Sequence, residues 1–168
     1  KGILEDETIQ KTGHNIKYDV IVLRNEGIHV RGVAFDTMLA SYLLNPNKAN
    51  HNLTDTAMEH LGIKKLSFSD VAGKGVKDFS EVPVEDASAY SGEDAAVTLK
   101  LKNRFRPLME KEGLTELFYG LEIPLVEVLA DMEMSGVRID VPLMNTFSTR
   151  LEKELASVEQ RIYFIAGE

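Results

Sequence analysis

The chain has 168 residues, 43% of them hydrophobic, and a formal net charge of −8, which allows one full domain or parts of two. It contains no cysteine, which excludes a disulfide framework and a thiolate metal site and favours a reducing compartment, and no apolar run is long enough to span a membrane. The acidic charge argues against a broad basic face for duplex DNA, but it is compatible with a small nucleic-acid site bridged by divalent cations.

The first half of the sequence predicts short extended segments that alternate with helices, which indicates an α/β fold. In chain order, the predicted elements are a helical turn over residues 4–10, an extended segment over 11–15, a helix over 17–26, a strand over 30–35, helices over 37–44 and 53–61, and a surface loop over 67–80. Gly27 and Gly62 are placed to end two of these helices. Asp36 is better suited to cap the helix that follows it than to bind a metal.

A long amphipathic helix is predicted over residues 83–112. Pro83 lies in its first turn, where a missing N–H costs nothing, and Gly113 follows its end. Beyond Gly113 the sequence becomes strongly apolar and helical. We therefore expect a domain boundary there, between residues 1–113 and residues 114–168.

The segment after this boundary is predicted as a helix over 114–135 that Pro124 kinks, followed by a turn and a short strand over 136–140. Asp140 is predicted to cap a last helix. Apolar residues recur along that helix at helical spacing, so one of its faces requires a partner surface.

Two aspartates are the candidate site residues that the pattern itself suggests. Asp94 lies one helical turn after Tyr90 on the stripe predicted to face the core, and a buried carboxylate requires a cation or several donors. A solvated helix edge is the ordinary alternative. Asp19 lies in the first turn of its helix, where the macrodipole favours an acid without any catalytic role. Brought together, two carboxylates can hold divalent ions for phosphoryl transfer, although such sites usually draw on three or four acids.

The motifs around these acids carry a resemblance to a known family. Asn-x-x-Tyr-Asp at residues 15–19 and Tyr-x-x-x-Asp at 90–94 resemble the second and third motifs of the DEDD-type 3′→5′ exonucleases with a tyrosine in the third motif. Further stretches resemble the proofreading domain of bacterial family A DNA polymerases, namely residues 14–19, 31–39, 72–75 and 93–99. Residues 123–140 resemble the segment that leads from that domain into the polymerase thumb. The resemblance implies a partial ribonuclease H-like fold followed by the α-helical start of the thumb.

The same resemblance implies roles for individual residues. Asp19 and Asp94 would bind two divalent metal ions, Mg²⁺ or Mn²⁺, and Tyr90 would orient the attacking water. The contacts to nucleic acid would come from Asn15, Lys17, Tyr18 and Phe68. Stacking of a frayed base on Phe68 agrees with the sequence tolerance of single-strand binding, although an ordinary loop anchor explains this phenylalanine equally well.

The sequence also departs from the family pattern. The first motif, Asp-x-Glu, supplies two of the four carboxylates in the family, and residues 5–7 are a poor substitute, so we expect the missing acids upstream of Lys1. His14 replaces the usual Gln. Asn50 replaces an Arg expected near the terminal phosphate, which weakens that predicted contact, and the neighbouring His51 is predicted to be a surface residue.

The resemblance implies an enzyme that extends primers with dNTPs and removes mispaired 3′ ends as single-stranded DNA, in the bacterial cytoplasm at the nucleoid. The chain itself is expected to be an inactive piece of such an enzyme, and any oligomer an artefact of an unprotected sheet edge. A stand-alone exoribonuclease similar to ribonuclease D uses the same motifs, although the segment after Ile123 argues against it. A vestigial exonuclease domain that serves as a structural or DNA-binding platform is the third alternative.

Overall fold

The computed structural model describes residues 1–66 and 79–167. The chain forms two compact units, Lys1–Met134 and Ser135–Glu168. The helical segment after Gly113 therefore packs with the first unit up to Met134. The compact units divide after Met134 and not near Gly113. The boundary predicted near Gly113 concerns the change in the character of the sequence there, and it stays a prediction.

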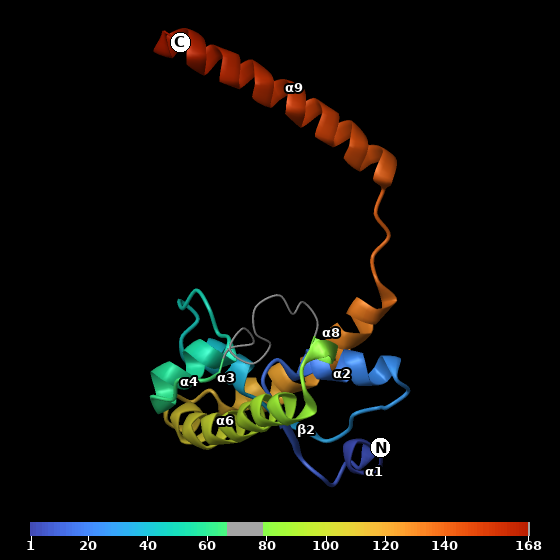
Figure 1. Ribbon diagram of the computed structural model, residues 1–168, viewed down its shortest axis with the longest axis vertical. Coiled ribbons are helices and arrows are strands. Elements are labelled where there is room, and N and C mark those ends of the chain that lie inside the picture. Colours follow the sequence, from blue (N-terminus) through green and yellow to red (C-terminus); the bar gives the residue numbers. More distant parts are fainter. Residues whose placement is uncertain (67–78, 168) are drawn as a thin grey trace. The chain divides into compact units, whose positions relative to one another are not determined.

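The first unit contains a small parallel sheet, as the alternation of elements predicts. Strand β1 (Lys11–Gly13) pairs with β2 (Val33–Asp36), and α2 (Ile16–Asn25) forms the connection between them (Figure 1). In the register, Thr12 lies opposite Phe35. The preceding helix α1 covers only Gly2–Glu5, shorter than the predicted turn over 4–10. The predicted α/β class is confirmed.

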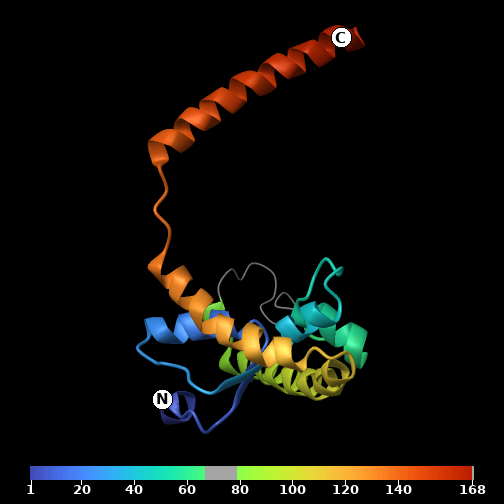
Figure 2. The same cartoon turned by 180° about the vertical axis from the view of Figure 1, so that it is seen from behind.

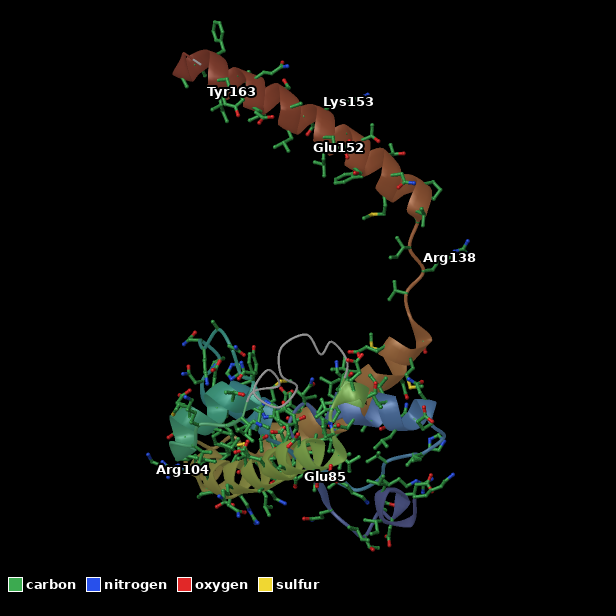
Figure 3. The ribbon with its side chains drawn as sticks, viewed as in Figure 1. Glu85, Arg104, Arg138, Glu152, Lys153 and Tyr163 are labelled. Atoms are coloured by element: carbon green, nitrogen blue, oxygen red, sulfur yellow. The ribbon has the colours of Figure 1, made fainter. Side chains whose placement is uncertain are left out.

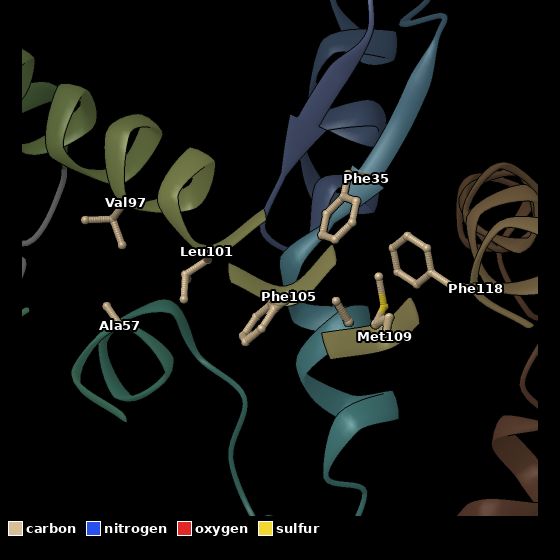
Figure 4. Packing of buried hydrophobic residues seen from close by; sticks show 8 residues of the cluster. Phe35, Ala57, Val97, Leu101, Phe105, Met109 and Phe118 are labelled. Carbon is tan, nitrogen blue, oxygen red and sulfur yellow. The ribbon is translucent and has the colours of Figure 1, made fainter. Parts of the chain in front are cut away.

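Three helices surround the core beside this sheet. They are α3 (Thr37–Leu44), α4 (Leu53–Leu61) and α6 (Val84–Lys111), close to the predicted bounds. Gly62 ends α4 with a φ of 66° in the left-handed region, as predicted. The fully buried core side chains come from β2, α3, α4 and α6 and from the segment after α6 (Figure 4): Phe35, Ala40, Ala57, Val97, Leu101, Phe105, Met109 and Phe118.

The apolar segment predicted as one helix over 114–135 changes its helical type along its length. It consists of α7 (Thr115–Leu117), a π-helical turn η2 (Phe118–Glu122) and α8 (Ile123–Ser135). Pro124 lacks the N–H that would continue the α-helical pattern, which accounts for the wider turn just before it. The guanidinium of Arg24 in α2 pairs with Glu127 and Asp131, which holds α8 against α2 (Figure 2).

The second unit consists mainly of α9 (Val141–Ala166). Asp140 caps it as predicted, because its Oδ1 accepts a hydrogen bond of 3.0 Å from the Leu143 N–H. Charged side chains such as Glu152 and Lys153 project from this helix, and its apolar stripe is exposed (Figure 3). The strand predicted over 136–140 is wrong: these residues form an irregular segment, because the described chain offers them no strand with which to pair. No helix in the described ranges is long and apolar enough to cross a membrane.

Candidate active site

A pocket of about 510 Å³ lies where β1, α2 and α6 meet in the first unit. Both candidate aspartates line it: Asp19 from α2 and Asp94 from α6. The two residues are 75 positions apart in the sequence, from 19 to 94, and the fold brings them to one cavity. The structure therefore provides the juxtaposition on which the two-carboxylate interpretation depends.

The position of α2, and so of Asp19, is fixed by the buried carboxylate of Asp36. This side chain is 1% exposed and accepts hydrogen bonds from the backbone N–H groups of Asn15 (3.2 Å) and Ile16 (2.7 Å). It also accepts from Met38 (2.8 Å) and Leu39 (3.2 Å), which confirms the predicted cap of α3. One carboxylate thus satisfies free donors at the starts of two helices.

The chain turns sharply where β1 passes into α2. Asn15 adopts a φ of 59°, in the left-handed region that Asn tolerates better than most residues. Gly13 must stay small there, because a Cβ at this position would lie 2.7 Å from the Cβ of Ile16. This close approach allows the first turn of α2 to begin directly beside the strand.

The carboxyl group of Asp19 lies in an environment that disfavours its charge. Burial raises its pKa, and the nearby negative charge of Asp36 acts in the same direction, while hydrogen bonding to its own backbone N–H opposes both. An anion with incomplete hydration binds a cation more favourably than a fully hydrated one. The electrostatic environment of Asp19 is therefore consistent with a cation site.

The third-motif residues lie near a buried lysine. The Lys65 ammonium contacts Asp94 Oδ1, and it lies 3.8 Å from Glu93 Oε2 and 4.7 Å from the ring centroid of Tyr90. Burial lowers the pKa of Lys65, an effect that the Glu93 carboxylate opposes. The ring of Tyr90 also lies 6.0 Å from that of Phe79, centroid to centroid. Asp94 thus has a counter-ion of its own in this structure.

The other predicted site residues differ in their placement. Tyr90 does not line the pocket, although it lies one turn from Asp94. Tyr18 is 66% exposed on α2, available for a ligand. The Lys17 ammonium pairs with Glu133 of α8. Phe68 lies outside the described residues. The nucleic-acid contacts of these residues and of Asn15 stay predictions.

Two histidines lie at or beside positions at which the sequence departs from the family pattern: His14 at one of them, and His51 next to Asn50. His14 lines the pocket, and its Nδ1 lies 2.9 Å from Thr37 Oγ1, whose hydroxyl donates to the Gly13 carbonyl at 3.1 Å. His51, predicted as a surface residue, is instead half-buried, with its Nδ1 2.9 Å from Ser41 Oγ. Neither partner could be identified from sequence, because both contacts depend on how α3 packs.

Burial of histidine should make the fold sensitive to mild acid. Burial lowers the pKa of His14 below 6.5, opposed by the charge of Asp36, and it also lowers the pKa of His60. The unfolded chain then binds more protons than the folded chain below about pH 6.5, so the free energy of unfolding falls as the pH decreases through that range. We expect His14→Gln to reduce the difference between the free energies of unfolding at about pH 7.5 and about pH 5.5, each measured by urea titration.

His29 provides the matched control, because its side chain is exposed. The substitution His29→Gln should leave the difference between the two pH values as it is in the wild type. Equal acid sensitivity in His14→Gln and the wild type would contradict the assignment of this sensitivity to His14.

The pocket offers the type of ligand atom that a hard cation binds. Carboxylate oxygens are the ligands that Mg²⁺ and Mn²⁺ prefer, and Asp19 and Asp94 supply them. Within residues 1–66 and 79–167, however, no group of three or more His, Cys, Asp or Glu side chains is arranged to hold a metal ion. These residues therefore fit part of a metal site rather than a whole one.

Comparison with known proteins agrees with the resemblance that the motifs of the chain carry. A family model for DNA polymerase A, described as 3′-5′ exonuclease, matches residues 1–110. The chain is 38% identical over 173 residues to DNA polymerase I of Pseudomonas aeruginosa, covering 100% of this chain and 19% of that polymerase. It is 39% identical over 162 residues to DNA polymerase I of Chloroflexus aurantiacus, covering 94% and 17%. The chain thus spans less than a fifth of the length of these relatives.

A solved structure has a similar fold. It is the POL domain of Pol1 from M. smegmatis in a complex with DNA primer-template and dNTP, with a TM-score of 0.70 and 22% sequence identity. The match covers 98% of this chain and 26% of that chain. At this level of identity the likeness concerns the fold alone.

Proposed function

This chain belongs to the 3′-5′ exonuclease family of DNA polymerase A, and we propose that it forms one side of a proofreading site in a longer bacterial DNA polymerase. The observation that carries the proposal is the shared pocket of Asp19 and Asp94. These acids belong to the segments that resemble the second and third motifs, and a phosphoryl-transfer site draws on carboxylates from separate elements of the fold.

We assign the following roles to the residues of the chain. Asp19 and Asp94 would hold divalent cations, and such cations would supply an activated water and charge stabilisation for an in-line displacement at phosphorus. Tyr90 orients the attacking water. The 3′-terminal nucleotides of a single strand would contact a set of polar and aromatic side chains, which also includes one residue outside the described part of the chain: Asn15, Lys17, Tyr18 and Phe68.

Two carboxylates do not complete such a site, so further ligands must come from elsewhere in the polymerase. We propose that an Asp-x-Glu motif N-terminal to Lys1 supplies them, on a strand beside β1. The length of the relatives supports this proposal, because each extends well beyond the matched region. The 168-residue chain alone is then expected to bind Mg²⁺ or Mn²⁺ weakly and to cleave no DNA.

We further propose that residues 114–168 begin the polymerase domain. The complete enzyme would bind primer-template DNA and dNTPs and would act in the bacterial cytoplasm. The names of the relatives support this, and so does the fold shared with a polymerase domain. A mispaired 3′ end would then leave the polymerase site and enter the pocket of Asp19 and Asp94.

The proposal is tested by Asp94→Ala in the complete polymerase. We expect excision of a 3′ mispair to fall by at least about a hundredfold, because a metal ligand is lost, while primer extension is unchanged. Asp86→Ala is the matched control, since Asp86 is an exposed acid on the same helix α6. It should leave both rates unchanged.

Three other outcomes would overturn parts of the proposal. Unchanged excision in Asp94→Ala would reject the site assignment. No excision even in the wild type would indicate a domain that serves only as a platform for the polymerase. Faster removal of ribonucleotides than of deoxyribonucleotides would favour the ribonuclease D-like alternative.

A further inference from the structure

A buried lysine contacts the carboxylate of Asp94, one of the two proposed metal ligands. The Lys65 side chain is 2% exposed, and it follows the end of α4 by four residues. Its ammonium reaches three groups that all belong to α6, those of Tyr90, Glu93 and Asp94. Neither the motifs nor the pattern of the sequence indicates this residue.

Contacts with residues of α6 hold both the Lys65 ammonium and the backbone beside it in place. Its Nζ contacts Asp94 Oδ1, lies 3.8 Å from Glu93 Oε2 and lies over the Tyr90 ring at 4.7 Å from the centroid. The next residue anchors the same segment, because the Leu66 N–H donates a hydrogen bond of 2.9 Å to Glu93 Oε2. The ammonium therefore sits among the third-motif residues on a fixed backbone.

We propose that Lys65 is a built-in counter-ion of Asp94, which a divalent cation must displace in order to bind there. This inference rests on the proposed function, since it assumes that Asp94 is a metal ligand. An oxygen that already contacts an ammonium is not free as a ligand, and two cations on one carboxylate repel each other in a partly buried site. Lys65 thus acts through Asp94 and Tyr90 rather than on the substrate.

The same contacts link the binding of a cation at Asp94 to the surroundings of Tyr90. An ammonium displaced from Asp94 would also change its contact with the face of the Tyr90 ring, so binding of the cation would be coupled to the side chain that is proposed to orient the water. Lys11, which lines the pocket, is not a counter-ion of Asp94 in this structure, because its ammonium contacts the backbone carbonyl of Asp6.

The first test is a titration of the complete polymerase with Mn²⁺, without DNA or dNTP, in which the free ion is measured by electron paramagnetic resonance and the binding that is lost in Asp94→Asn is assigned to this site. We expect Lys65→Gln to lower the Kd for Mn²⁺ by roughly tenfold relative to the wild type, because a like charge is removed from the ligand. Lys64→Gln is the matched control: it removes the same charge from the preceding, exposed residue and should change the Kd by less than about twofold.

The outcomes of this titration separate the two proposals. An equal or higher Kd in Lys65→Gln, with binding that is lost in Asp94→Asn, would overturn the counter-ion role and leave the metal site intact. Absence of Asp94-dependent Mn²⁺ binding from the complete polymerase, in both the wild type and Lys65→Gln, would overturn both proposals. A lysine that only supports the structure would not make binding tighter when its charge is removed.

A second measurement needs no variant that could fail to fold. In the wild type, the reaction of each lysine with an amine-reactive reagent is followed by mass spectrometry, with and without Mn²⁺. We expect Lys65 to react slowly without the ion and several-fold faster with it, while Lys64 reacts at one rate throughout. Unchanged protection of Lys65 at saturating Mn²⁺ would overturn the inference.

Discussion

Replacing Asp36 with Ala is expected to lower the free energy of unfolding of the first unit by about 3 kcal/mol, because four backbone N–H groups lose a charged acceptor at once. The carboxylate is buried, so water cannot readily replace it. Urea unfolding followed by circular dichroism measures the change. The substitution should also displace the start of α2, which carries Asp19.

Asp140→Ala is the matched control for this prediction. Asp140 also caps a helix, but it is exposed and accepts a single hydrogen bond from the Leu143 N–H. Its loss should cost about 1 kcal/mol of helix stability in α9 and leave the unfolding of the first unit unchanged. Equal effects of the two substitutions would show that Asp36 is an ordinary cap rather than the anchor of two helices.

The second large effect is expected in the core. Phe105→Ala should lower the free energy of unfolding by about 4 kcal/mol, because it removes a fully buried ring and leaves a cavity between α4 and α6. The ring of His60 packs edge-on against it with centroids 4.7 Å apart, so that contact is lost as well. Urea unfolding again provides the measurement.

Leu99 lies on the same helix but is 54% exposed, which makes Leu99→Ala a suitable comparison. Leu99→Ala should change the free energy of unfolding by no more than about 0.5 kcal/mol, as most surface substitutions do. If Phe105→Ala were no more destabilising than Leu99→Ala, then α6 would not pack as the structure shows.

Much of the fold is local enough to predict from sequence. Asp36 as a cap and Gly62 as a helix end each follow from short-range preferences of the backbone. On α6, Val97, Leu101 and Phe105 are buried as the helical spacing of the stripe indicates, while Tyr90 and Asp94 on the same stripe are half-buried. The short strand expected over 136–140 failed for a non-local reason, since a strand needs a neighbouring edge.

The candidate site is predictable only in part. The motifs identified Asp19 and Asp94, but their meeting in one pocket depends on how α2 packs against α6. Lys65 was not identified as a neighbour of the site, because its contact with Asp94 joins segments far apart in the chain. His14 lies within the second-motif stretch, but its contact with Thr37 was not identified for the same reason. A lysine or histidine alone carries no local signal for such a partner.

The most direct test of the proposed proofreading site uses a version of the chain extended upstream, so that it includes the proposed Asp-x-Glu motif. A single-stranded DNA labelled at its 3′ end is incubated with Mn²⁺, and the release of nucleoside monophosphate is measured. We predict release that is lost in Asp19→Asn and in Asp94→Asn and retained in Asp86→Asn. Release that persists in both of the first two variants would contradict the account.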